Sequence, residues 1–157
     1  MLGIRRREFI SLLGGAAAWP LTASAQQGDR LRRIGVLMAY DENDPAAKTI
    51  VSTFTQALAG LGWTDGRNVR MDLRWWGDDT NRLRALAQEL AGLQPDIILT
   101  CTTPTTVALQ RETRTIPIVF ASVDDPVASG IVPRLNQPGG NITGFALYEP
   151  TLPGKWA

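Results

Sequence analysis

The 157-residue sequence contains no histidine and a single cysteine, Cys101. Without histidine, a Ser-His-Asp triad and the usual kinds of zinc site are excluded. One thiol excludes an intrachain disulfide, and a thiol nucleophile would lack an activating base. Because Cys101 ends an apolar run, the pattern favours a buried structural thiol. The sequence therefore predicts no catalytic residue and no metal site.

Nucleotide-binding and phosphate-binding signatures are also missing. Ala39-Tyr40-Asp41 follows the first apolar run, where a dinucleotide fingerprint needs closely spaced glycines. No Gly-Lys-Ser/Thr phosphate loop occurs, and threonines flank Cys101 where a receiver domain would carry its phospho-acceptor aspartate. The charges nearly balance, with 16 basic and 15 acidic residues, whereas nucleic-acid binding needs a concentrated positive face. We predict a protein that is not an enzyme, with no cofactor and no nucleic-acid partner.

The longest apolar stretch is too short for an ordinary membrane-spanning helix, and it lies near the N-terminus. Arg6 and Arg7 precede this stretch and Phe9 begins it, and together they resemble the core of a twin-arginine export signal. Ala23 and Ala25 place small residues at the two positions that a signal peptidase reads. An ordinary secretory signal with a basic start is the alternative. We predict that residues 1–25 form an export signal that is cleaved after Ala25.

Five apolar runs predict five β-strands. Three of them show no polar face, which is typical of strands buried on both sides in a parallel sheet. Another alternates apolar with charged residues from Val69 onward, so we expect it at the sheet edge. The predicted strands are residues 34–39, 69–76, 97–99, 118–121 and 142–147.

Helical patterns separate these strands. Apolar residues recur at spacings of three and four after Pro45 and again after Asp79 or Thr80, and Pro104 suits the first position of a third helix. A short helix is predicted over residues 127–135. Alternating strands and helices predict a doubly wound parallel α/β sheet of about five strands. The half-exposed second strand favours the order 2-1-3-4-5.

That order places a switch point between the first and third strands, where open α/β sheets bind ligands. Thr102 and Thr103 offer hydroxyl groups beside the free amides of a helix N-terminus, a combination that binds a carboxylate. The alternative is that these threonines only cap the helix. Asp124 is able to bind an ammonium group, whereas Asp125 favours helix capping. Tyr40 either stacks on a ligand or covers the edge of the core.

Several segments resemble solute-binding proteins of ABC importers, in the group often described as tryptophan/tyrosine-type. Together they cover almost the whole chain after the signal, in the expected order. They are RRIGVLMAYDENDP, LGWTDGRNV, DIILTCTTPTTVALQ, TRTIPIVFASVDDPV and PGGNITGF.

The resemblance implies one lobe of a type I periplasmic-binding fold. It implies a periplasmic protein that presents a small carboxylate-bearing solute, such as an amino acid, to an ABC permease in the inner membrane. The ligand-facing positions would follow the first, third and fourth strands. They are Tyr40, Asp41, Thr102, Thr103, Pro104, Ser122, Val123 and Asp124.

The chain departs from this family in length. Such proteins have two lobes and are roughly twice as long. We therefore expect residues 26–147 to form the N-terminal lobe and residues 148–157 to begin a hinge, with the second lobe missing. The alternatives are a sensory or interaction module that contacts a membrane receptor, or an inactive fragment.

Overall fold

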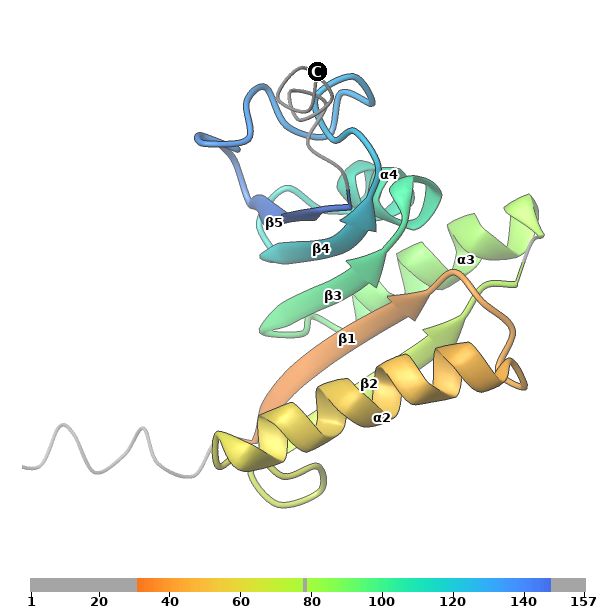
Figure 1. Cartoon of the computed structure of the whole chain (residues 1–157), viewed down its shortest axis with the longest axis vertical. Helices are drawn as coiled ribbons and strands as arrows, with labels where there is room; N and C mark the ends of the chain where they lie inside the picture. Colours follow the sequence, from red (N-terminus) through yellow and green to blue (C-terminus); the bar gives the residue numbers. More distant parts are fainter. Residues whose placement is uncertain (1–30, 78, 148–157) are drawn as a thin grey trace, which may run out of the picture. The chain divides into compact units, whose positions relative to one another are not determined.

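The computed structural model describes residues 31–77 and 79–147, so the predicted signal and hinge lie outside the described residues. All strands of the sheet are parallel and lie in the order β2-β1-β3-β4-β5 (Figure 1), which confirms the predicted fold class and order. The elements are β1 (Arg32–Met38), α2 (Pro45–Gly60), β2 (Val69–Trp75), α3 (Thr80–Gly92), β3 (Ile97–Cys101), α4 (Thr103–Glu112), β4 (Ile118–Val123) and β5 (Ile142–Ala146).

Aspartate caps start two of the helices where the sequence predicted them. Asp44 Oδ1 accepts hydrogen bonds from the amides of Ala46 and Ala47, at 2.7 and 3.3 Å, and α2 begins at Pro45. Asp79 Oδ1 accepts from two amides of the first turn of α3 in the same way. Each carboxylate satisfies amides that have no partner inside the helix, so these caps fix where the helices begin.

Helices α3 and α4 cover one face of the sheet and enclose the main core. Leu90 and Leu109 from these helices are fully buried against Ile98 and Ile118 of the sheet. Gly35 lies under α3, where an added Cβ would collide with the side chain of Leu90. Gly35 is therefore a position where β1 and α3 pack closely against each other.

Helix α2 lies on the opposite face, over a smaller core cluster of Val36, Met38 and Cys101. The predicted apolar stripe of α2 is buried only in part, because Ile50 is 47% exposed and Leu61, just beyond the helix, is 76% exposed. Over the whole of α2, Ala47 is the one fully buried residue. The spacing after Pro45 thus predicted the helix, but the apolar face of that helix is buried only in part.

Two further expectations are corrected. Residues 127–135 form turns rather than a helix, because Gly130 has a positive φ of 69° and Pro133 follows soon after. Asp125 does cap this segment, with its Oδ1 accepting from the amides of Val127 and Ala128 at 3.1 and 2.9 Å. Asp72, expected on the charged outer side of β2, is 7% exposed.

Candidate functional site

The carboxyl ends of β1 and β3 lie side by side, so the switch point forms where the sequence predicted it. The amide of Ala39 donates to Cys101 Sγ at 3.4 Å and joins the two strand ends. Burial raises the pKa of the Cys101 thiol, which keeps it protonated. Cys101 is thus a structural residue beneath the edge.

The turn before α4 is fastened by two buried threonines. The Thr105 hydroxyl donates to the Cys101 carbonyl, and the Thr106 hydroxyl donates to the Thr102 carbonyl at 2.7 Å. These hydroxyls serve the backbone and are not presented to a ligand. Thr102 and Thr103 are half-buried, and the Thr102 side chain caps no amide of α4. The first turn of α4 therefore keeps amides that no described side chain satisfies.

Two residues at this edge hold strained backbone conformations. Thr102 has φ 71° and ψ 159°, a region that is otherwise almost confined to glycine, and Ser122 has φ 55°. The amide of Thr102 donates to the carbonyl of Ala121 at 3.1 Å and so links the turn after β3 to β4. Strain of this kind persists only where the surroundings enforce it, and it clusters at ligand sites.

The turn after β1 contributes one aromatic and one acidic side chain to the edge. Tyr40 is 37% exposed, and its carbonyl accepts from the amide of Gly77 at 3.2 Å. Asp41 is exposed, and its Oδ1 accepts from the amide of Asn43 at 2.8 Å, which shapes the turn. Tyr40 is therefore accessible, whereas one oxygen of Asp41 already has a local role.

The structure extends β4 to Val123, so Ser122 and Val123 end this strand, and Asp124 alone of the three predicted residues follows it. Val123 is fully buried in the main core, and its carbonyl accepts from the amide of Leu147 at 2.7 Å, so its side chain does not reach the edge. Ser122 is exposed. Asp124 is exposed and has no hydrogen bond or ion pair with another described residue. Its carboxylate is available to a cationic group.

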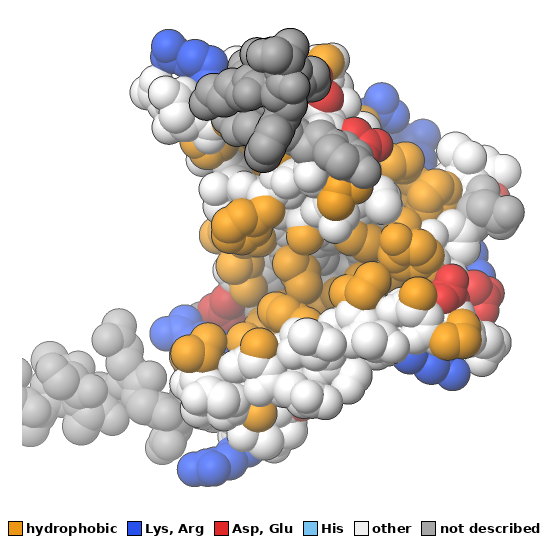
Figure 2. Space-filling view, in the orientation of Figure 1, with side chains coloured by type: hydrophobic (Ala, Val, Ile, Leu, Met, Phe, Trp, Pro, Cys, Tyr) orange, Lys and Arg blue, Asp and Glu red, His pale blue; other side chains and the backbone are white. Residues whose placement is uncertain are grey.

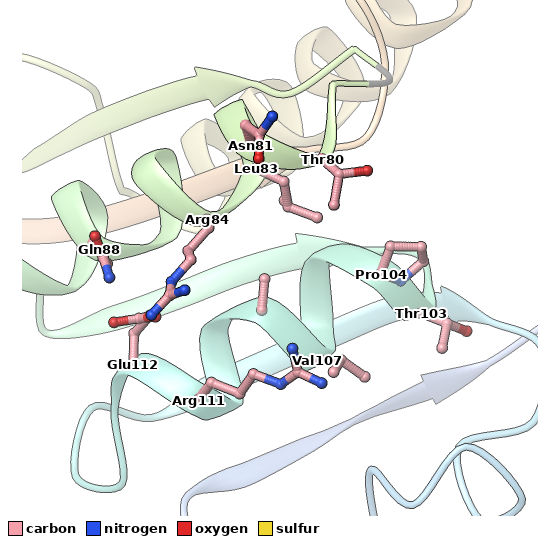
Figure 3. A pocket seen from close by; sticks show the side chains of 11 residues that line it. Thr80, Asn81, Leu83, Arg84, Gln88, Thr103, Pro104, Val107, Arg111 and Glu112 are labelled. Atoms are coloured by element: carbon pink, nitrogen blue, oxygen red, sulfur yellow. The ribbon is translucent and has the colours of Figure 1, made fainter.

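A groove of about 830 Å³ runs between α3 and α4 and meets the predicted edge at Thr103 and Pro104 (Figure 3). Sequence reasoning missed this groove, because it forms only where α3 and α4 pack beside each other, and neither helix shows it by its own pattern. Its lining residues are Thr80, Asn81, Leu83, Arg84, Gln88, Thr103, Pro104, Val107, Ala108, Arg111 and Glu112.

Within residues 31–77 and 79–147, no three or more acidic, cysteine or histidine side chains gather as metal ligands would. No helix in these ranges has the length and hydropathy to cross a membrane.

The fold and the switch-point edge define one lobe of a doubly wound α/β ligand-binding protein. The family model described as "ABC transporter substrate binding protein" matches residues 34–151, and the chain belongs to this family. A tyrosine-binding protein of Clostridioides difficile is 34% identical over 119 residues, which are 74% of this chain and 33% of that protein.

Solved structures show the same relationship. A Streptococcus pneumonia ABC domain in complex with L-Trp has a TM-score of 0.68 at 26% identity, with 74% of this chain and 39% of that chain covered. A conserved domain protein of Vibrio cholerae has a TM-score of 0.71 at 30% identity, with 77% and 40% covered. The chain thus spans about a third of the curated relative and two fifths of these structures.

Proposed function

We propose that this chain supplies one lobe of the solute-binding component of an ABC importer. In this proposal it has no catalytic activity and is exported to the periplasm behind residues 1–25. It offers a small carboxylate-bearing solute to a permease in the inner membrane. The tyrosine-binding relative and the L-Trp complex favour an aromatic amino acid as that solute.

The observation that carries the proposal is the turn between β3 and α4. Thr102 and Thr103 lie beside uncapped amides of a helix N-terminus, which is a preformed position for an anion. Thr102 and Ser122 keep positive φ angles, a strain that persists only where the surroundings fix the backbone, which supports a preformed site at the ends of β3 and β4. Asp124 is exposed on the same edge, where it is able to pair with the ammonium group of an amino acid.

Titration of the chain with L-tryptophan, followed through its amide NMR signals, tests the proposal. One lobe excludes water from only one side of a solute, so we expect weak binding, on the order of 1 mM. The amide signals of Thr103, Thr105 and Ser122 should shift. The amides of Asn81 and Arg82 begin α3 but are already bonded to Asp79, so they should stay in place.

Tryptamine is the matched control, because it keeps the ring and the ammonium group but lacks the carboxylate. We expect it to leave the Thr103 and Thr105 signals where they are. Equal shifts of these amide signals with both compounds would show that the helix N-terminus does not bind the carboxylate. Shifts confined to the groove around Arg84 and Arg111 would move the site to the α3–α4 side of the lobe.

A further inference from the structure

The groove between α3 and α4 holds two arginine side chains that no other described residue engages. Figure 3 shows Arg84 extending from α3 toward α4, while Arg111 extends along α4. Both residues are exposed, and neither guanidinium group forms a hydrogen bond or an ion pair with another residue of the described ranges. The arginines of β1 and β2 differ, since each of them pairs with an aspartate or a glutamate side chain. The groove therefore offers two guanidinium groups to a binding partner.

The groove combines these charges with an apolar floor. Val107 and Ala108 are half-buried, pack against the main core and also line the groove. Glu112 is the one carboxylate of the lining, so its basic side chains outnumber its acidic ones by two to one. A carboxylate pairs with a guanidinium group through two parallel hydrogen bonds, and a third helix is able to pack into the groove between two others. The lining thus suits an amphipathic helix that carries carboxylates beside its apolar stripe.

Further chain of a longer protein is a weaker candidate for this groove. Helices α3 and α4 already cover their face of the sheet, and a doubly wound domain has one layer of helices on each face. The sheet lacks cover on its other face, where Leu99 and Val119 are half-buried and Phe145 is 75% exposed. Figure 2 shows hydrophobic side chains across that face above α2, with charged side chains mainly around its margin. Further chain of the same domain would pack on that apolar area, whereas the groove lies outside a complete helix layer.

A second copy of this chain and a membrane surface are also weaker candidates. In a two-fold pair the same surface of both copies meets, which would bring like guanidinium groups together. An anionic membrane attracts clusters of about four to eight lysine and arginine residues, whereas the lining has two arginines and one glutamate. A concave groove also encloses a narrow segment better than it meets a broad bilayer. An acidic segment of another protein remains the best match.

We propose that this groove binds an amphipathic helix of a partner protein, whose carboxylates pair with Arg84 and Arg111 and whose apolar side chains lie on Val107 and Ala108. Arg111 lies eight residues after Thr103, which is about 12 Å along α4. The two arginines are thus separate from the proposed solute edge, and binding in the groove does not depend on the proposed function.

NMR titration of the full 157-residue chain with two helical peptides tests this proposal. One peptide carries leucines along one face and glutamates beside them, and the other has lysines in place of the glutamates. We expect the glutamate peptide to shift the side-chain Nε signals of Arg84 and Arg111 and the amide signal of Ala108. The lysine peptide should leave these signals in place, because like charges repel.

Variants that change one kind of charge make the test specific. Arg84→Glu combined with Arg111→Glu should raise the dissociation constant of the glutamate peptide by at least about tenfold and should allow the lysine peptide to bind. Glu112→Gln removes the carboxylate of the lining, so it should lower the dissociation constant of the glutamate peptide by up to about fivefold. Arg67→Glu is the matched control, because Arg67 is exposed and lies before β2, outside the groove lining. It should bind the glutamate peptide as the unchanged chain does, and amide spectra check the fold of every variant.

The proposal is overturned if neither peptide binds, or if both bind equally to the unchanged chain. A preference for the glutamate peptide that survives in the double arginine variant would place the binding surface elsewhere. Phosphatidylglycerol vesicles that shift the two arginine signals when the peptide does not would assign the groove to a membrane. Loss of peptide binding when residues 31–147 are joined to the remaining part of the tyrosine-binding relative would identify that part as the occupant, and would equally overturn the proposal.

Discussion

The side chain of Arg33 on β1 crosses to the neighbouring strand and donates from Nε to Oδ2 of Asp72 on β2. Its Nη1 also donates to the carbonyl of Leu93, just beyond α3, at 3.1 Å. The amide of Arg33 donates to the side chain of Asp96, just before β3, at 2.8 Å. One residue thus fastens three strands and a helix at the end of the sheet opposite the proposed solute edge.

This relationship predicts how stability depends on pH. The hydrogen bond from Arg33 holds the pKa of Asp72 below its ordinary value, although burial acts in the opposite direction. Because the pKa is lowered in the folded state, the stabilisation is complete above the unfolded value of about 3.9 and disappears as pH falls through the folded value. We expect Asp72→Asn to cost about 1–3 kcal/mol at pH 7. Urea unfolding should show this difference shrinking below about pH 4.

A matched control exists between β2 and α3. Arg74 and Glu89 form an ion pair at 2.6 Å, but the Glu89 side chain is 51% exposed. Water screens such a pair, so Glu89→Gln should cost no more than about 1 kcal/mol. Equal losses in the two variants would mean that the burial of Asp72 has no energetic consequence.

A second prediction concerns the contact between β1 and α3. In Gly35→Ala the new methyl group would collide with the side chain of Leu90, which is fully buried in the main core. We expect a loss of about 1–3 kcal/mol in the free energy of unfolding. In Gly92→Ala, at the end of α3, the new methyl group has no neighbour within 4 Å, so stability should stay the same or rise by up to about 1 kcal/mol. Denaturant midpoints of both variants decide the matter, and a stable Gly35→Ala protein would contradict the close packing.

A third prediction concerns export. Replacing Arg6 and Arg7 by lysines should block export if the signal is of the twin-arginine type, because that pathway reads the pair itself. Arg5→Lys is the control and should leave export intact. The exported protein should begin at Gln26, which N-terminal sequencing of the periplasmic fraction checks. Unchanged export of the double variant would assign the signal to the general secretory route.

The arrangement of the sheet was predictable because its determinants are local. Apolar runs without a polar face mark buried parallel strands, and Asp44 and Asp79 mark helix starts through their own side chains. The same reasoning failed over residues 127–135, where the cap at Asp125 starts a turn that Gly130 and Pro133 do not allow to continue.

The details of the site depend on contacts that the sequence does not encode locally. A run of threonines does not reveal that Thr105 and Thr106 bond to the backbone while Thr102 and Thr103 remain at the edge. The alternation along β2 likewise predicts that its charged side chains are exposed to water. It does not reveal that Asp72 is instead buried and paired with Arg33 of the neighbouring strand. The incomplete cover of the sheet was also not predicted, because apolar runs indicate only that a strand needs cover.

The last prediction concerns the affinity of the complete site. We expect the solute carboxylate to bind at the start of α4, held by the hydroxyls of Thr102 and Thr103 and by nearby amides. A two-lobed version, made by joining residues 31–147 to the remaining part of the tyrosine-binding relative, should bind an aromatic amino acid more tightly than the single lobe. In it, Thr102→Val and Thr103→Val should each cost about 1.5–3 kcal/mol, which is roughly a ten- to hundredfold loss of affinity.

Calorimetric titration of the two-lobed protein and of the present chain measures both effects. Thr115→Val is the control, because Thr115 is exposed and follows α4, away from its N-terminus. Valine keeps the shape of threonine, so in Thr102→Val and Thr103→Val the free energy of unfolding should change less than the affinity, and Thr115→Val should leave the affinity unchanged. Full affinity in both Thr102→Val and Thr103→Val would show that the carboxylate does not bind at the N-terminus of α4. A half-site that is open to water lacks the contacts of the facing wall, so we expect weak binding to the present chain. Tight binding to it would contradict this expectation and show that one lobe encloses the solute.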